Sequence, residues 1–491
     1  MKKIIHLLTF TFLLLFINSC SKDYFDVNTP SGTATEEQLN MNDLLGPAIF
    51  RTFRAQYYAE RSFGNYSQYF TGQTGGAAGT TSISGTWTNI YLYIIPNLDI
   101  ILKKSEELSA KHYNAVAKIL LAVNLGLATD SWDYVPYSEA NQGINGNIKP
   151  SFDSQESIYN EIFNLLTEAI NQLEATDNSG YNLGNEDLIY FGDFSKWLKA
   201  AYTLRARYGL HLMYKTGYDK NQILSDLNNG FSGNGDDMQM FFDSRNMNPW
   251  YTREILARNT GNDHDKIGDQ LVSYMNGTSY AFNTINEDPR LPVYAQKDNP
   301  TEPWRGYLSG GNGDSSDGNP ANTDFKTDGF YTSQDAPIII ISYAEALFIR
   351  AEVEFVKNGG TTTSIGSTSA AYQAYMDGIA ANMSKLGVDG TDYMNEASIA
   401  VGQAGLKLEH IMKEKYIANF LNPETFVDLR RYDFSNDVFK DLDLPVDNAS
   451  SEFPGQWLVR AVYPNSEESA NADNVNAHKK SPVEPVWWDD I

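Results

Sequence analysis

The sequence predicts a mainly α-helical fold: a helical scaffold with an irregular, loop-rich lobe inserted between its parts. The stretch 337–357 supplies the first observation. Ser342 stands at a helix N-cap position, Glu345 follows three residues later as in a capping box, and apolar residues then recur at helical spacing. The second observation is the stretch 217–335, where frequent Gly, Asn and Asp turns leave little room for long helices.

Other stretches show the same apolar spacing, and short connections between them predict helix pairs. W-L-K-A-A-Y and Y-A-E-A-L-F-I-R-A-E are similar to tetratricopeptide helices, although the fixed period of that repeat is not kept. Asp153 or Ser154 is expected to cap one helix, and Pro96 to kink another. The expected helices are 35–58, 87–104, 113–128, 153–173, 194–214, 342–357, 371–386, 405–421 and 424–432.

The first residues have the pattern of a bacterial signal peptide. Lys2 and Lys3 precede the apolar stretch 4–17, which is too short to span a bilayer and ends in I-N-S-C at Cys20. A cysteine directly after such a stretch is typical of a lipobox. We therefore predict a signal peptide over 1–19 and lipidation of Cys20. The alternative is an ordinary secretory signal with an incidental cysteine.

The predicted organisation of the mature chain is simple. Residues 20–36 are polar and form a lipidated tether, and residues 37–491 form one domain with the loop-rich lobe inserted between its helical parts. Several acyl chains on Cys20 suffice for stable membrane anchoring. Cys20 is also the one cysteine of the chain, so acylation leaves no thiol for disulfides or metals.

Composition narrows the classes of partner. The formal net charge is −25, which argues against binding nucleic acid or anionic lipid through the surface field. The chain has 30 tyrosines, whose rings bury area while the hydroxyl stays polar, and such residues suit wet binding surfaces as well as cores.

Two glutamates of the 337–357 stretch need cations. Glu345 and Glu352 lie beside the apolar stripe of the predicted helix, and carboxylates in such a position require partners. The stretch 409–433 can supply Lys415, Arg430 and Arg431. We predict a structural ion-pair network and expect each arginine to pair with a glutamate.

The candidate ligand site combines two non-helical segments. The stretch 61–87 mixes aromatic rings with Asn65, Gln68 and Gln73, and the stretch 245–335 contains W-R-G-Y and further aromatics. Flat rings beside uncharged amides suit a sugar, whose C–H face packs on a ring while its hydroxyls bond to amides. The alternative is that the rings seal the core. The predicted contacts are Trp304, Arg305, Tyr307, Trp87, Tyr69, Phe70, Gln73, Trp250 and Tyr331.

Several quoted segments resemble the SusD/RagB family. P-I-I-I-I-S-Y-A-E-A-L-F-I-R-A-E, E-K-Y-I-A-N-F-L-N-P-E-T-F-V-D-L-R-R and D-P-R-L-P-V-Y carry the resemblance, which runs from Trp87 to Val475. Where the family usually has Gly, this chain has Asp133, which tolerates a positive φ better than most residues. The final V-E-P-V-W-W-D-D-I is outside the family pattern and is either a docking tail or an aromatic plug.

The resemblance implies a function. Members are Bacteroidetes surface lipoproteins of the outer membrane that bind nutrients, often glycans, over a SusC-like TonB-dependent transporter. We therefore expect a nutrient-uptake protein that binds an oligosaccharide and is not an enzyme, with no cofactor and no metal. Nucleophile-elbow, zinc-protease and nucleotide-binding motifs are absent from the sequence. The alternatives are a surface glycoside hydrolase, and a transporter lid or adhesin that binds peptide or no small ligand.

Four aspartates of the lobe and one histidine are candidate metal ligands by residue type. Asp314, Asp317, Asp324 and Asp328 lack the alternation and the glutamate of a calcium loop, so a solvated loop is expected. His264 lies between two aspartates and is expected to be an exposed loop residue.

Overall fold

The computed structural model describes residues 36–73 and 75–489. The predicted signal peptide and the lipidation site Cys20 lie outside the described residues. Met41–Ile491 make up one unit, and the described residues before Met41 belong to a separate one that contains the short helical turn η2 (Glu36–Gln38).

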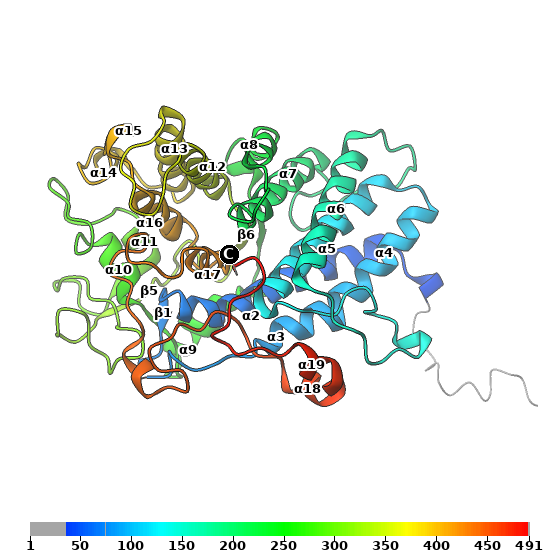
Figure 1. Ribbon diagram of the computed structural model, residues 1–491, viewed down its shortest axis with the longest axis horizontal. Helices are drawn as coiled ribbons and strands as arrows, with labels where there is room; N and C mark the ends of the chain where they lie inside the picture. The colour runs from blue at the N-terminus through cyan, green and yellow to red at the C-terminus, as the bar shows by residue number, and fades with distance from the viewer. Residues whose placement is uncertain (1–35, 74, 490–491) are drawn as a thin grey trace, which may run out of the picture. The chain divides into compact units, whose positions relative to one another are not determined.

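The scaffold is a succession of helices in which each packs against the next. In Figure 1 this row leads from α4 and α5 through α6, α7 and α8 to α12 and α13, and α16 packs beneath the last pair. The mainly α-helical fold predicted from the sequence is thereby confirmed. The bounds are α4 (Ile95–Glu107), α5 (Lys111–Trp132), α6 (Gln155–Glu174), α7 (Phe194–His211), α8 (Lys220–Asn229), α12 (Tyr343–Lys357), α13 (Ser369–Lys385) and α16 (Leu408–Ala418).

Helix α2 (Met41–Tyr66) crosses the row and contacts α4, α5 and α17 (Glu424–Arg430). The predicted helix ended at residue 58, but α2 continues for two further turns. Phe63 and Tyr66 explain the extension, because both rings are buried against Phe426 of α17, with a centroid separation of 4.6 Å for the Phe63 pair. The final turns are therefore stabilised by a partner that is distant in sequence.

Local signals account for several helix starts. The Ser154 side chain accepts a hydrogen bond from the N–H of Ser157 at the start of α6, so Ser154 is the cap. Ser342 accepts from the N–H of Glu345 at 3.2 Å, as predicted. Pro96 lies within the continuous helical stretch 84–107, where the π-helical turn η3 (Asn89–Ile94) passes directly into α4. The regular α-helical pattern is therefore interrupted directly beside the proline, at a combination of features typical of helix kinks.

Helix α5 is long and apolar enough to cross a membrane by composition alone. However, 94% of its most apolar window is buried inside the protein. It is the core helix of the scaffold, flanked by α4 and α6 in Figure 1.

The irregular lobe contains short elements joined by turns. Three antiparallel two-stranded sheets pair β1 with β3, β2 with β6 and β4 with β5. The first pairing joins Phe70 to Ile267 and thereby ties the segment after α2 to the lobe. The strands are β1 (Phe70–Thr71), β2 (Met238–Phe241), β3 (Lys266–Ile267), β4 (Ala295–Lys297), β5 (Thr323–Phe325) and β6 (Pro337–Ile341).

The remaining elements are short. In the lobe and near the chain end they cover the scaffold without extending the row of helices. They are α3 (Ser84–Thr88), η4 (Gly143–Asn145), η5 (Asn234–Asp236), η6 (Tyr251–Leu256), α9 (Ala257–Asn259), α10 (Asp269–Met275), α11 (Leu291–Tyr294), α14 (Thr391–Met394), α15 (Gly402–Gly405), η7 (Val446–Ser450), α18 (Asn465–Ala470) and α19 (Ala472–His478).

The predicted ion-pair network is present, but one of its glutamates has a different partner from the one expected. Glu352 is bound by Arg431 and lies 3.6 Å from Nζ of Lys415. Glu345 is bound instead by Arg207 of α7, whose Nε and Nη2 lie 2.7 and 2.6 Å from its carboxylate. Because Arg207 holds this carboxylate, Glu345 stabilises helix packing in addition to its role in the first turn of α12.

The prediction that Arg430 pairs with a glutamate is wrong. Within the described ranges no carboxylate lies at ion-pair distance from it. Its Nη1 donates to the main-chain oxygens of Asp130 at 2.7 Å and Val459 at 3.0 Å, and the guanidinium lies over the rings of Phe426 and Trp488. Arg430 thus joins α17 to α5, to Val459 and to the C-terminal tail through carbonyls and aromatic faces.

The C-terminal segment is an aromatic plug. Trp488 is 1% exposed, and its indole N–H donates to Asp130 of α5 at 2.8 Å. Its main-chain N–H donates to Gln155 of α6. The tail therefore closes the scaffold where α5, α6 and α17 meet.

Candidate functional site

A polar cleft of about 510 Å³ lies beside α2, and we call it the α2 cleft. One wall is helix α2, a second is the segment that follows it, and the third comes from the lobe. This is the place where the sequence predicted the two non-helical segments to meet. The lining residues are Tyr58, Arg61, Ser62, Asn65, Tyr66, Gly76, Gly79, Thr80, Thr81, Ser82, Ile83, Ser84, Gly85, Arg253 and Asp265.

Helical spacing explains the first wall. Tyr58, Arg61, Ser62 and Asn65 are separated by three, four and seven positions, so they share one face of α2. The opposite face of the same turns carries the buried Phe63. A polar stripe that includes a tyrosine is the signal that the sequence analysis missed, since it ended the helix before Arg61.

Tyr58 supplies a fixed aromatic surface. Its ring is half-buried and backs onto Gly85, where an added Cβ would lie 2.5 Å from the ring. Arg54, one turn earlier, donates to the Tyr58 hydroxyl at 2.9 Å, and its guanidinium lies 5.1 Å from the ring centroid. The ring is therefore held in one orientation before any ligand arrives, which reduces the entropy that binding must overcome.

The second wall is a hydroxyl-rich segment, 79–85. Tyr66 donates to the main-chain oxygen of Gly79 at 2.8 Å, and the hydroxyls of Ser62 and Thr81 lie 3.0 Å apart, so α2 holds the segment in place. Ile83 has φ 38°, in the left-handed region that a β-branched side chain rarely adopts. Backbone strain of this kind concentrates at functional sites.

The third wall comes from the lobe. Arg253 of η6 lies 3.5 Å from Asp265, and the main-chain N–H of Asp265 donates to the buried carboxyl of Glu254 at 2.8 Å. Burial raises the pKa of the Asp265 carboxyl, while the positive charges of Arg253 and Arg61 oppose that rise. The pKa of Glu254 is raised well above its ordinary value, chiefly by burial and next by the charge of Asp265.

Chemically, the α2 cleft offers one ring face, hydroxyl and amide groups, and two guanidinium groups. The Oδ1 atom of Asn65 is buried and has no hydrogen-bond partner within the described residues. Asn65 as a whole is half-buried and lines the α2 cleft, so the rest of its amide group is available to a ligand hydroxyl. The combination is suited to a polyhydroxylated molecule with a flat apolar face.

Five of the predicted contacts are core residues, which corrects the expectation for them. Tyr69 is fully buried and its hydroxyl bonds to Thr425, and Phe70 and Trp250 pack edge to face at 5.5 Å. Burial leaves these rings no face for a ligand. The five, with their exposed fractions, are Tyr69 (0%), Phe70 (1%), Trp250 (2%), Tyr331 (5%) and Trp87 (6%).

These five rings instead seal the core, which was the alternative stated for them in the sequence analysis. Trp87 contacts Trp132 edge to face at 5.0 Å, and Tyr331 packs in the same way on Tyr294 at 5.4 Å. Trp250 and Tyr331 also line a void of about 10 Å³, which is close to the volume below which not even one water fits.

The other predicted contacts lie outside the α2 cleft. Gln73 is exposed, and Arg305 is engaged by Asp317 at 2.9 Å and Glu302 at 3.2 Å. Trp304 is half-buried, with its indole N–H bonded to Glu287 and Lys297 Nζ 5.1 Å from its ring. Tyr307 is 9% exposed, and its main chain bonds to Ile267 and Asp269.

His264 is also corrected: it is buried rather than exposed. Its Nε2 lies 3.2 Å from Asp324, which in addition binds Lys266 at 2.6 Å and Arg258 at 3.1 Å. Three cationic or basic groups around one carboxylate form a structural cluster that stabilises β3 against β5. Across the described residues no group of His, Cys, Asp and Glu side chains is arranged to hold a metal ion.

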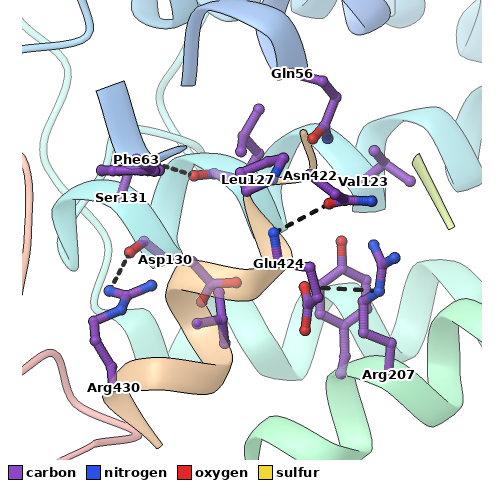
Figure 2. Close-up of a pocket in the computed structure, with 13 residues that line it drawn as sticks. Gln56, Phe63, Val123, Leu127, Asp130, Ser131, Arg207, Asn422, Glu424 and Arg430 are labelled. Atoms are coloured by element: carbon purple, nitrogen blue, oxygen red, sulfur yellow. Dashed lines mark hydrogen bonds and ion pairs between the residues drawn. The ribbon is translucent and has the colours of Figure 1, made fainter. Parts of the chain in front are cut away.

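A charged cavity inside the scaffold is too small for a sugar. Figure 2 shows Asp130, Arg207, Glu424 and Arg430 around it, contributed by α5, α7 and α17. Its volume is about 30 Å³, enough for one water rather than a ligand. His211 and Arg207 hold the pKa of Glu424 at about 2 against the effect of burial, so this site is part of the ion-pair network.

A second surface groove, of about 310 Å³, lies between α10 and the segment before η7. Its lining contains Asp269, Asp441 and Asp443 but no aromatic ring among the described residues. It therefore lacks the stacking surface that Tyr58 gives the α2 cleft.

Comparison with known proteins identifies the family. A family model described as starch-binding and associating with the outer membrane matches residues 33–464. The chain is a SusD-like protein of the SusD/RagB family. The family resemblance noted in the sequence is thus confirmed, and membership makes this SusD-like protein a carbohydrate-binding, outer-membrane-associated protein.

Solved structures agree on the fold. A SusD/RagB family protein from Bacteroides thetaiotaomicron has a TM-score of 0.72 at 22% identity, covering 92% of this chain and 99% of its own. A chitin-binding protein has a TM-score of 0.71 at 24% identity, with 92% and 100% covered. A chitin-binding SusD homologue from Flavobacterium johnsoniae has 0.69 at 19%, with 91% and 98% covered. No curated protein matches the chain.

Proposed function

We propose that this SusD-like protein is a lipoprotein anchored through Cys20 on the cell surface, where it captures an oligosaccharide in the α2 cleft and delivers it to a SusC-like TonB-dependent transporter. The observation that carries the proposal is the α2 cleft itself. In a chain of a starch-binding family, it combines the fixed ring of Tyr58 with hydroxyl, amide and guanidinium donors.

The dimensions of the α2 cleft support a saccharide of more than one unit. A volume of about 510 Å³ falls within the range of ordinary small-ligand pockets, roughly 300–1,000 Å³. The lining is polar, so the recognition energy comes from hydrogen bonds arranged around one ring face. A neutral or charged sugar satisfies both requirements.

A binding role fits the α2 cleft better than hydrolysis does. A glycoside hydrolase needs two carboxyl groups on either side of the bond that it cleaves. Among the described residues that line the α2 cleft, Asp265 carries the single carboxyl group, because Glu254 is fully buried behind it. The proposal is therefore capture without chemistry.

A glycan array tests the proposal. The mature chain without its lipid, labelled and applied to immobilised oligosaccharides, is expected to bind a subset of them, and the bound sugars are expected to release no reducing ends on incubation. Absence of binding to every glycan would overturn the proposed ligand class, and release of reducing ends would assign the alternative, a hydrolase. Co-purification with a TonB-dependent transporter from native membranes tests the delivery step separately.

A further inference from the structure

One cation of the α2 cleft, Arg61, has no hydrogen-bond or ion-pair partner among the described residues, although its charge acts at longer range on Asp265. Arg61 lies on the polar face of α2, is exposed, and makes no ion pair or hydrogen bond with any residue in the described ranges 36–73 and 75–489. The other cation, Arg253, is engaged by Asp265 at 3.5 Å and Asp263 at 3.6 Å. The protein has 62 acidic and only 37 basic side chains, so an unpaired arginine in a ligand cleft stands out.

The surroundings of Arg61 define what it can bind. Tyr58 lies one turn before it and Asn65 one turn after it, so a ring face, a cation and a half-buried amide follow one another along one helix face. Side chains at such spacing are roughly 5–6 Å apart at their Cβ atoms, a separation comparable with one sugar ring and its exocyclic group. A guanidinium presents a planar fork that matches a carboxylate or sulfate in two parallel hydrogen bonds.

We propose that the saccharide bound in the α2 cleft is anionic. The carboxylate or sulfate of one sugar unit pairs with Arg61, the ring of that sugar unit lies on Tyr58, and one of its hydroxyls hydrogen-bonds the amide of Asn65. This inference rests on the proposed function. The charge of Arg61 also acts at longer range on Asp265, but Arg253 lies 3.5 Å from that carboxylate and offsets its repulsion of an anionic ligand.

The test compares charged glycans with their neutralised counterparts. Wild-type protein is applied to a panel that contains neutral oligosaccharides, uronic-acid oligosaccharides and sulfated oligosaccharides, together with carboxyl-reduced and desulfated forms of the same chains. We expect at least one anionic member to bind and its neutralised form to bind roughly ten- to a hundredfold more weakly. Carboxyl reduction and desulfation distinguish a carboxylate from a sulfate.

Two variants assign the effect to Arg61. Arg61→Gln is expected to lose the same factor as neutralisation of the glycan, and Arg61→Lys to lose less, because it keeps the charge but not the fork. Since Arg61 is exposed and unpaired, both variants should melt as the wild type does. Binding to neutral glycans alone, or anionic binding that Arg61→Gln leaves unchanged, would overturn the inference while retaining the proposed function. Absence of binding to the whole panel would overturn both.

Discussion

The main-chain N–H of Trp487 donates a hydrogen bond of 3.1 Å to the carboxylate of Asp133. Asp133 has φ 74°, so it occupies the backbone conformation for which a glycine would otherwise be preferred. The same carboxylate lies 2.9 Å from Lys480 and 3.3 Å from Arg460. The two features that were expected from the sequence to depart from the SusD/RagB pattern, Asp133 and the aromatic tail, therefore contact each other.

Substitution of Asp133 should loosen the tail. Asp133→Asn keeps a side chain that tolerates positive φ but removes the charge that Lys480 and Arg460 contact. The free energy of unfolding is expected to fall by about 1–3 kcal/mol, because the buried guanidinium of Arg460 loses its carboxylate partner. The loss stays within this range because Arg460 keeps its hydrogen bonds to two main-chain carbonyls. Urea unfolding measures the loss, and faster trimming by carboxypeptidase reports release of the tail. Unchanged trimming in Asp133→Gly as well would contradict the anchoring role.

Glu60 should make the protein less stable as the pH rises. Its carboxyl is 1% exposed, neither oxygen has a partner within the described residues, and burial raises its pKa well above the ordinary 4.5. The folded state therefore keeps a proton that the unfolded chain releases, so the contribution of Glu60 to stability is fully present below pH 4.5 and is lost as the pH rises toward the folded-state pKa.

Glu60→Gln removes this titration and keeps the shape of the side chain. The variant is expected to be more stable than the wild type above pH 4.5, by a margin that grows with pH. Melting temperatures between pH 4 and pH 9, taken as roughly the working range, measure the margin. Glu168→Gln is the matched control, because its side chain on α6 is 59% exposed. A margin that stays constant with pH would show that Glu60 is charged in the folded protein.

Arg431→Ala should destabilise the protein without affecting the ligand site. Arg431 is buried between Glu352 and Asp428, and its loss leaves both carboxylates short of a partner, at a cost of about 3–5 kcal/mol. It does not line the α2 cleft, so the affinity of the folded variant should be unchanged. Arg245→Ala is the control for a surface arginine, because that side chain is 87% exposed. Normal melting with lost binding would place Arg431 in the ligand site instead.

Tyr58→Ala should weaken glycan binding while the protein stays folded. Loss of one stacking face is expected to cost about 1–2 kcal/mol, a factor of roughly five to thirty in Kd. Calorimetry with a glycan identified on the array gives the affinity, and a thermal scan gives the melting temperature. Trp304→Ala provides the opposing test: if it weakens binding and Tyr58→Ala does not, the ligand lies at the W-R-G-Y segment.

Cys20→Ala should abolish membrane anchoring. The cysteine follows a signal-type apolar stretch, and the acyl chains that it would carry supply the anchoring energy. Cell fractionation and labelling with a lipid precursor measure the effect. A variant that is still membrane-bound and labelled would disprove the lipidation site.

The sequence by itself determined the family, the helical scaffold and the existence of a charge network. These features depend on local patterns, because each pattern involves residues that are close together in the sequence. The patterns are the cap at Ser342, the periodicity of α5 and α6, and carboxylates placed beside apolar stripes. The meeting of the segment after α2 with the lobe was also predictable, because glycines there exclude a long helix, although the first residues of the predicted 61–87 loop belong to α2.

Only the tertiary structure decided which side chains face the α2 cleft. The tyrosine and tryptophan rings of the two segments are chemically suited to sugar and to core alike, and packing against distant partners such as Phe426 and Trp132 buried most of them. The same long-range packing extended α2 to Tyr66 and so turned Arg61 and Asn65 outward on one helical face. Partners such as Arg207 and Glu345, which are 138 positions apart in the sequence, follow from topology, because no local pattern indicates which distant segment will lie beside a given helix.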